Sequence, residues 1–80
     1  MTGRDFIGEA RAIANRLETL GVHEPAAALR DAIDFSSTGS EILFGLRFHL
    51  HQVVARANAP DDLCHDAKTL AEAIDAALKH

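Results

Sequence analysis

The sequence predicts an all-α protein, a single domain over residues 1–80 that folds as a four-helix bundle of two antiparallel helical hairpins, with the third helix longest and central. Three observations favour this class. Apolar residues recur every three or four positions, which is the period of one helix face. The 80 residues include fifteen Ala, a residue that suits helices and is poor in strands. Signals for helix starts and ends divide the chain into four segments.

The first helix is expected at residues 3–20. Thr2 and Asp5 have the spacing of a capping box, in which a hydroxyl and an acidic side chain three residues later satisfy free backbone N–H groups. Gly21 stands where a left-handed residue usually ends a helix. The apolar positions between these signals are spaced by four, three, four and three: Phe6, Ala10, Ile13, Leu17 and Leu20.

The second helix is expected at residues 25–35. Pro25 suits its first turn, because the N–H that proline lacks would have no partner there. Arg30 and Asp34 are four residues apart on the outer side and can form a weak pair. The apolar stripe continues through Val22, Ala26, Leu29 and Ile33.

The third helix is expected at residues 39–58. The segment Thr38-Gly39-Ser40-Glu41 repeats the capping-box pattern and predicts the start of this helix. Pro60 predicts its end, because the residue before a proline is pushed out of helical geometry.

The fourth helix is expected at residues 61–79. Asp61 and Asp62 suit its N-cap and first turn, where acidic side chains complement the helix dipole. Asp75 and Lys79 are spaced as an outer i,i+4 pair. Its apolar stripe is Leu63, Ala67, Leu70, Ile74 and Leu78.

The third helix is apolar on two faces. At about 100° per residue, one apolar stripe covers about a third of the helix, which is enough for a bundle; it comprises Ile42, Leu43, Leu46, Leu50, Val53, Val54 and Ala57. Phe44, Phe48 and Ala55 fall on the opposite side, beside His51 and Glu41. This second face is either covered by neighbouring helices within the monomer or available to another chain.

If the second face binds another chain, its two Phe side chains would anchor the contact, since aromatic residues carry much of the binding energy at interfaces. Arg47 and Arg56 lie at the borders between the faces and would be rim residues. Gly45 would either allow a close approach of helices or cost stability. The predicted partner-binding residues are Phe44, Phe48, His51, Arg47 and Ala55.

Composition and charge exclude several function classes. The formal net charge is -4 and the pI is about 5.6, which argues against a nucleic-acid footprint and against a polybasic membrane surface. The first residues run straight into an amphipathic pattern, so we expect no signal peptide, and no window approaches 18 uncharged apolar residues. The single Cys64 cannot form an internal disulfide. We therefore expect a cytoplasmic protein.

The polar residues predict no catalytic or metal site. His49 and His51 are two residues apart and point in nearly opposite directions on a helix, so they cannot grip one metal ion as i,i+4 histidines do. Asp62, His65 and Asp66 share a face, but a di-iron site needs a second such motif, which the chain lacks. Neighbouring residues of a helix point about 100° apart, so Cys64 is not activated by His65 and is expected to be a partly buried filler.

A serine-modified carrier is a further class to weigh, because acyl carrier proteins are also acidic four-helix chains. Their modified serine lies in an Asp-Ser-Leu motif at a helix start, after a long first loop. Here Ser36 and Ser37 follow Phe35, Ser40 precedes Glu41, and no Asp-Ser-Leu motif occurs. Helix capping explains these hydroxyl groups better.

The leading hypothesis is a small, non-enzymatic, bacterial-type protein-interaction module that forms a homodimer through the second face of the third helix. One alternative is an immunity or antitoxin protein that neutralises a basic toxin, because residues 61–80 hold five acids against two lysines. The other is a carrier protein with a modified serine. We expect no cofactor, no metal and no small-molecule substrate.

Overall fold

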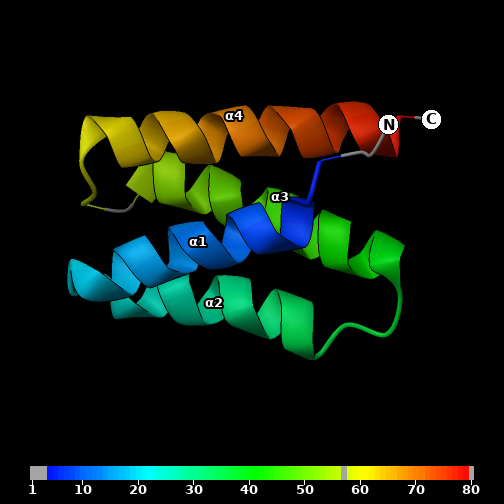
Figure 1. The fold of residues 1–80 in the computed structure, drawn as a ribbon, viewed down its shortest axis with the longest axis horizontal. Coiled ribbons are helices and arrows are strands. Elements are labelled where there is room, and N and C mark those ends of the chain that lie inside the picture. Colours follow the sequence, from blue (N-terminus) through cyan, green and yellow to red (C-terminus); the bar gives the residue numbers. More distant parts are fainter. Residues whose placement is uncertain (1–3, 57, 80) are drawn as a thin grey trace.

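The computed structural model describes residues 4–56 and 58–79 of the chain (Figure 1). Four α-helices follow one another: α1 (Phe6–Thr19), α2 (His23–Asp34), α3 (Gly39–Arg56) and α4 (Asp61–Leu78). The described ranges contain no strand. The predicted all-α class with four helices is therefore confirmed. No helix within these ranges is both long enough and apolar enough to cross a membrane.

Helix α1 begins later than the capping pattern predicts. Asp5 is the N-cap residue, and its carboxylate accepts a hydrogen bond from the backbone N–H of Gly8 at 2.9 Å. The first helical residue is Phe6. The expected cap Thr2 and the expected first residue Gly3 lie outside the described residues. Asp5, which the predicted capping box placed three residues after the cap, is therefore the N-cap residue itself.

The end of α1 depends on a glycine. Gly21 has a φ of 82°, and the N–H groups of Gly21 and Val22 donate to the carbonyls of Glu18 and Leu17 at 3.0 and 2.9 Å. This is the Schellman arrangement, which needs a left-handed backbone conformation that only glycine adopts without strain. The chain has already left the helix at Leu20, so this side chain is exposed instead of completing the predicted apolar stripe.

The starts of α2 and α3 follow the local chemistry of the sequence. Helix α2 begins at His23, two residues before the predicted start, and Pro25 still lies in the first turn. Helix α3 begins at Gly39 as predicted. Its capping box is confirmed: the N–H of Glu41 donates to the Thr38 hydroxyl, and the N–H of Thr38 donates to the Glu41 carboxylate, both at 3.2 Å.

The lengths of α3 and α4 correct two predictions. Helix α3 ends at Arg56 instead of residue 58, and Ala57 lies outside the described residues. Helices α3 and α4 each span 18 residues, so the prediction that the third helix is longest is wrong. Pro60, and not Asp61, is the N-cap of α4, and it offers no capping side chain.

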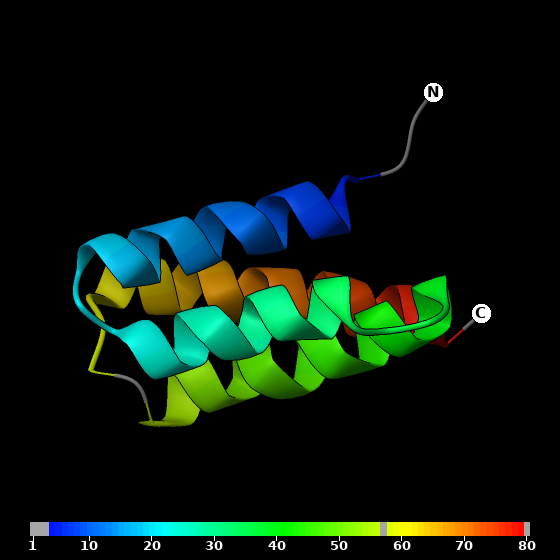
Figure 2. The ribbon, with the colours of Figure 1, turned by 90° about the horizontal axis from the view of Figure 1, so that it is seen from below.

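The helices form a ring in which each packs chiefly against two others. Both α1 and α3 pack against α2 and α4. The predicted central position of the third helix is therefore wrong: α3 lies along the lower edge of the bundle in Figure 2. A ring lets each helix bury one stripe, which is all that a bundle requires. Helix α2 packs on both α1 and α3, and α4 packs on both α3 and α1.

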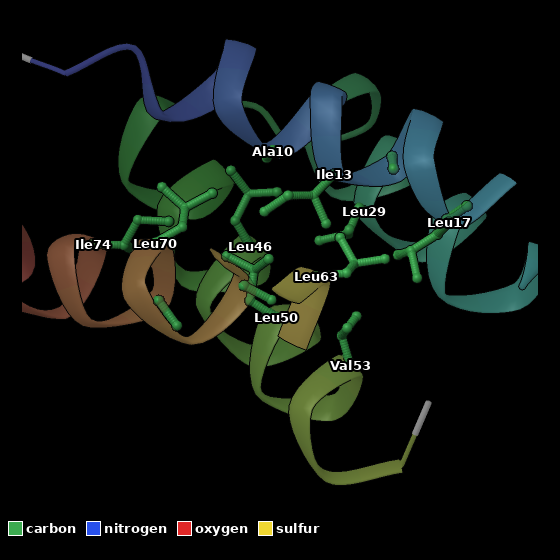
Figure 3. Packing of buried hydrophobic residues seen from close by; sticks show 14 of the residues in the cluster. Ala10, Ile13, Leu17, Leu29, Leu46, Leu50, Val53, Leu63, Leu70 and Ile74 are labelled. Carbon is green, nitrogen blue, oxygen red and sulfur yellow. The ribbon is translucent and has the colours of Figure 1, made fainter. Parts of the chain in front are cut away.

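The core is made of aliphatic side chains from all four helices (Figure 3). Its members are Ala10, Ile13, Ala14, Leu17, Ala26, Leu29, Ile33, Leu46, Leu50, Val53, Leu63, Ala67, Leu70, Ala71 and Ile74. None of the four Phe residues belongs to it. Phe6 packs partly buried at its edge, whereas Phe35, Phe44 and Phe48 are exposed. The predicted stripes are thus largely confirmed, but Val54 is exposed as well.

Helices α2 and α3 approach closely at Gly45. A Cβ atom added to Gly45 would lie 3.1 Å from the Cβ atom of Ala32 on α2. That distance is shorter than ordinary van der Waals contact between carbon atoms. Gly45 and Ala32 are therefore the small residues that set the spacing of these two helices.

Ion pairs connect neighbouring helices of the ring. Arg16 on α1 contacts two carboxylates on α4, those of Asp62 at 3.1 Å and Asp66 at 2.7 Å. Arg11 on α1 contacts Asp34 on α2 at 3.4 Å. These groups are largely exposed, so each pair contributes at most about 1 kcal/mol.

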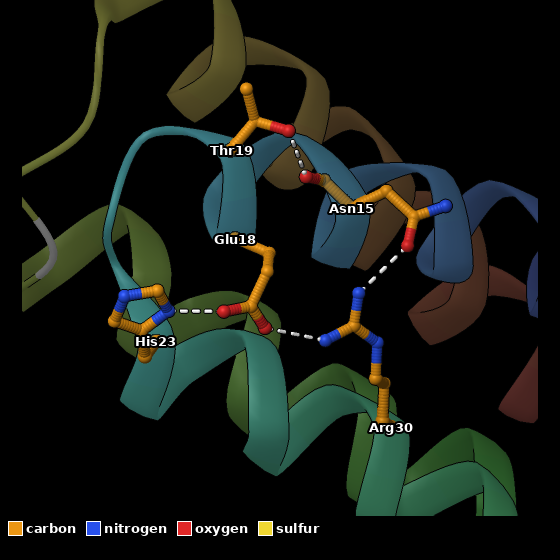
Figure 4. A network of polar contacts seen from close by, with 5 residues as sticks. All are labelled: Asn15, Glu18, Thr19, His23 and Arg30. Atoms are coloured by element: carbon orange, nitrogen blue, oxygen red, sulfur yellow. Dashed lines mark hydrogen bonds and ion pairs between the residues drawn. The ribbon is translucent and has the colours of Figure 1, made fainter.

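A polar network joins α1 to α2 (Figure 4). Arg30 donates to the Glu18 carboxylate and to the Asn15 side chain, both at 2.7 Å, and His23 contacts the other oxygen of Glu18. Arg30, followed by His23, holds the pKa of Glu18 below its ordinary value. Because Arg30 faces α1, the predicted pair between Arg30 and Asp34 is not formed.

Candidate protein-binding face

Four residues that the sequence assigned to the second face of the third helix lie on the side of α3 that points away from the bundle. Phe44 is 52% exposed and Phe48 is 58% exposed, and His51 and Ala55 are exposed as well. We call these four residues the outer face of α3. The described residues leave this face exposed, which settles the alternative that the sequence left open.

The local sequence explains why this face is left over. On the inner side of α3, Leu46, Leu50 and Val53 are completely buried against the other helices. Helices α2 and α4 flank α3 on two sides, and no other described helix packs extensively on it. The outer face therefore carries two large aromatic side chains that the folding of one chain does not bury.

Arg47 is the predicted site residue that the structure ties most firmly to the monomer. Its guanidinium forms an ion pair with Asp75 on α4 at 2.7 Å and lies 5.4 Å from the centre of the Phe44 ring. Lys79 contacts the same carboxylate at 3.2 Å, as predicted for the i,i+4 pair. Lys79, followed by Arg47, holds the pKa of Asp75 below its ordinary value. Arg47 thus lies at the rim of the outer face with its guanidinium already in an ion pair.

The two histidines of α3 point to different surroundings. The rings of Phe48 and His49 meet edge to face with their centres 5.1 Å apart. His49 is half-buried and lines a groove between α2 and α3, whereas His51 is exposed on the outer face. This separation follows from their spacing of two residues.

The groove between α2 and α3 has a volume of about 510 Å³. Val22, Pro25 and Ala28 supply its apolar wall, and Arg56 lies at the end of α3 beside it. Among residues 4–56 and 58–79, Arg56 is the one arginine that forms no ion pair. The groove is open, and no described residue forms an ion pair with Arg56.

The carboxylate and histidine cluster at the start of α4 has a structural explanation. Asp62 and Asp66 both accept hydrogen bonds from Arg16. In the described part of the chain, no group of three His, Cys, Asp or Glu side chains is placed to hold a metal ion. Cys64 is half-buried with its Sγ 3.7 Å from the carbonyl oxygen of Ala59, in agreement with a filler role.

The serines between α2 and α3 take part in helix ends. The Ser36 hydroxyl donates to the carbonyl of Ala32 at 2.6 Å in the last turn of α2. The N–H of Ser37 donates to the Glu41 carboxylate at 3.1 Å. These contacts tie Ser36 and the backbone of Ser37 to the turn.

One exposed aromatic residue was missed by the sequence reasoning. Phe35 is 81% exposed and lies immediately after α2. The sequence did contain a signal for this exposure, because Phe35 belongs to none of the apolar stripes. The buried stripe of α2 is already complete at Ile33, two residues earlier. An aromatic residue without a place in a stripe has no core position to occupy.

Comparison of the chain with known protein families gives no match, and comparisons with curated proteins and with solved structures give none either.

Proposed function

We propose that this chain is a small, non-enzymatic protein-interaction module that associates with a second copy of itself through the outer face of α3. One observation carries the proposal. The chain builds its core entirely from aliphatic residues and exposes two of its four aromatic side chains, Phe44 and Phe48, on a single helix face. Exposed aromatic residues that share a face are typical anchors of protein interfaces.

The energetics of the face favour association. An aromatic side chain buries about 150–250 Å² when fully covered, so each half-exposed Phe still offers on the order of 100 Å². At about 25 cal/mol per Å², covering both rings contributes on the order of 5 kcal/mol before the costs of association. Ala55 leaves room beside the rings, and His51 supplies a polar edge.

The test is the mass of the protein in solution over a range of concentrations. Wild-type protein is expected to change from monomer to dimer as its concentration rises in sedimentation-velocity experiments. The double variant Phe44→Ser/Phe48→Ser is expected to weaken the association about tenfold or more, because it removes both anchors.

The matched control is Phe35→Ser, which removes an aromatic side chain that is even more exposed but lies outside α3. This variant should associate like the wild type. A wild-type chain that stays monomeric at every concentration, or a control variant that weakens association equally, would contradict the proposal.

The two alternatives receive less support from the geometry. A toxin-neutralising protein would use the acids of α4, but Asp62, Asp66 and Asp75 already form ion pairs with arginines of the same chain. Asp61 and Glu72 are then the remaining acids of α4. A carrier protein would need a modified serine, and none of Ser36, Ser37 and Ser40 stands in an Asp-Ser-Leu motif.

Two further expectations belong to this proposal. We place the module in the cytoplasm, because Cys64 is a single free thiol without an internal partner for a disulfide. We also propose that the chain is organised as two antiparallel hairpins, α1 with α2 and α3 with α4. The second hairpin would then present the outer face as one unit.

A further inference from the structure

The outer face of α3 continues as a regular strip along the helix. Glu41, Phe44, Phe48, His51 and Ala55 follow one another at spacings of three, four, three and four residues. This is the heptad spacing with which one helix meets another along its length. Phe48 is the midpoint of the strip. A second helix could therefore lie along α3 over most of its 18 residues.

The charges at the two ends of α3 distinguish the possible directions of that second helix. In a parallel pair of identical helices, each residue faces its own copy, so Glu41 would meet Glu41 and Arg56 would meet Arg56. In an antiparallel pair centred on Phe48, Glu41 meets the end of the partner helix that carries Arg56. Opposite charges then face each other at both ends of the interface.

Both groups are available for such a contact. Arg56 is exposed and forms no ion pair within the described residues. Glu41 uses one carboxylate oxygen, Oε1, to accept the cap hydrogen bonds from Ser37 and Thr38. Its other oxygen points to no donor in the described part of the chain.

We propose that a second copy of this chain docks on the outer face with its α3 antiparallel, about a two-fold axis that passes beside Phe48. This inference rests on the proposed function and specifies its geometry. At the axis, Phe48 packs against the partner's Phe48, and on either side Phe44 packs against the partner's His51. Glu41 forms an ion pair with the partner's Arg56, and symmetry repeats this pair at the other end.

Arg47 does not oppose this arrangement, although both copies of it lie near the axis. Each guanidinium already contacts Asp75 of its own chain at 2.7 Å, so two ion-paired guanidinium groups meet there instead of two free ones. Its position over the Phe44 ring also holds that ring against the helix, which reduces the conformational entropy lost on docking.

The size of the interface sets the expected affinity. A strip of 18 helical residues is about 27 Å long and covers less than the roughly 800 Å² per partner of a standard interface. We therefore expect weak association, with a dissociation constant in the micromolar range or above.

Cysteine cross-linking tests the direction of the pair in a Cys64→Ser background. Phe48→Cys lies on the axis and is expected to form an intermolecular disulfide at least about tenfold faster than the control Phe35→Cys, because docking raises the effective thiol concentration. Ala55→Cys is expected to cross-link no faster than the control. In an antiparallel pair the two copies of residue 55 are about 20 Å apart along the helices, and a spin label at this position measures that separation directly.

Charge variants test the end contacts. Arg56→Glu is expected to weaken dimerisation several-fold, and so is Glu41→Gln, which keeps the capping hydrogen bonds but removes the charge. The two substitutions together should cost less than the sum of their separate effects, since they remove the same ion pair.

The outcomes separate this inference from the proposed function. Fast cross-linking through Ala55→Cys would show a parallel pair and overturn the inference. If the wild type dimerises but neither Phe48→Cys nor Ala55→Cys cross-links faster than the control, the inference is also overturned. In that case, loss of the dimer in Phe44→Ser/Phe48→Ser would still support the proposed function. A wild-type chain that is monomeric at all concentrations would overturn both.

Discussion

Single side chains of this protein connect its fold to its surface. Arg47 is the clearest case, because one guanidinium joins α3 to α4 through Asp75 and lies over the ring of Phe44. A residue that the sequence placed at a rim thus also holds an aromatic side chain in position. Glu18 has a similar role on the other side of the bundle, where it accepts bonds from Arg30 and His23 of α2.

The substitution Glu18→Gln tests that role through its pH dependence. The pKa of Glu18 is lower in the folded protein than its ordinary value, mainly because Arg30 donates to the carboxylate. The charged carboxylate therefore stabilises the fold at pH values above the unfolded pKa, and this contribution is lost as the pH falls through the folded pKa. We expect Glu18→Gln to be less stable than the wild type at neutral pH, and the difference to shrink in acid.

Urea unfolding at a series of pH values measures this difference. The control is Glu72→Gln, which removes an exposed acid of α4 that has no ion pair in the described ranges. A constant difference between Glu18→Gln and the wild type at all pH values would show that the lost interaction is not ionic.

At the scale of the elements, helix starts and ends could be predicted where the capping chemistry is local. The capping box of Thr38 and Glu41 and the left-handed Gly21 are formed as the sequence indicates. The start of α2 was placed too late because Pro25 fits anywhere in a first turn, and no side chain caps this helix. Ion pairs between helices, such as Arg16 with Asp66, depend on how the helices pack, which no local sequence pattern predicts.

The spacing of α2 and α3 gives a prediction at this scale. Gly45→Leu is expected to destabilise the monomer by about 1–3 kcal/mol, because its side chain has to enter the contact with Ala32. Ala55→Leu, on the outer face of the same helix, should change the stability of the monomer by no more than about 0.5 kcal/mol. Chemical denaturation at low protein concentration compares the two. Equal stabilities of Gly45→Leu and Ala55→Leu would contradict this prediction, because they would show that α2 and α3 can move apart without loss of stability.

At the scale of the whole molecule, the ring arrangement determines whether the second apolar face of α3 is buried, which the sequence alone could not show. Periodicity shows that α3 has two apolar faces, but it cannot show whether three other helices surround it. The ring buries Leu46, Leu50 and Val53 and leaves Phe44 and Phe48 outside. The candidate face was therefore predictable as a set of residues, whereas its exposure is a property of the assembled bundle.

Self-association also predicts how stability depends on concentration. A chain that dimerises only when folded is stabilised by its own concentration, so the midpoint of thermal unfolding should rise as the protein concentration increases. Calorimetry of Phe44→Ser/Phe48→Ser should show a midpoint that depends less on concentration over the same range. A concentration-independent midpoint in the wild type over the range where it dimerises would contradict the linkage of association to folding.

The aliphatic core has a spectroscopic consequence. The chain contains no Trp and no Tyr, so its four Phe rings are its only aromatic chromophores, and none of them belongs to the core. The fine structure of phenylalanine in near-ultraviolet circular dichroism depends on how firmly each ring is held. In this protein that signal reports mainly on the surface, and chiefly on whether something covers α3, while loss of the core is followed best in the far-ultraviolet bands of the backbone.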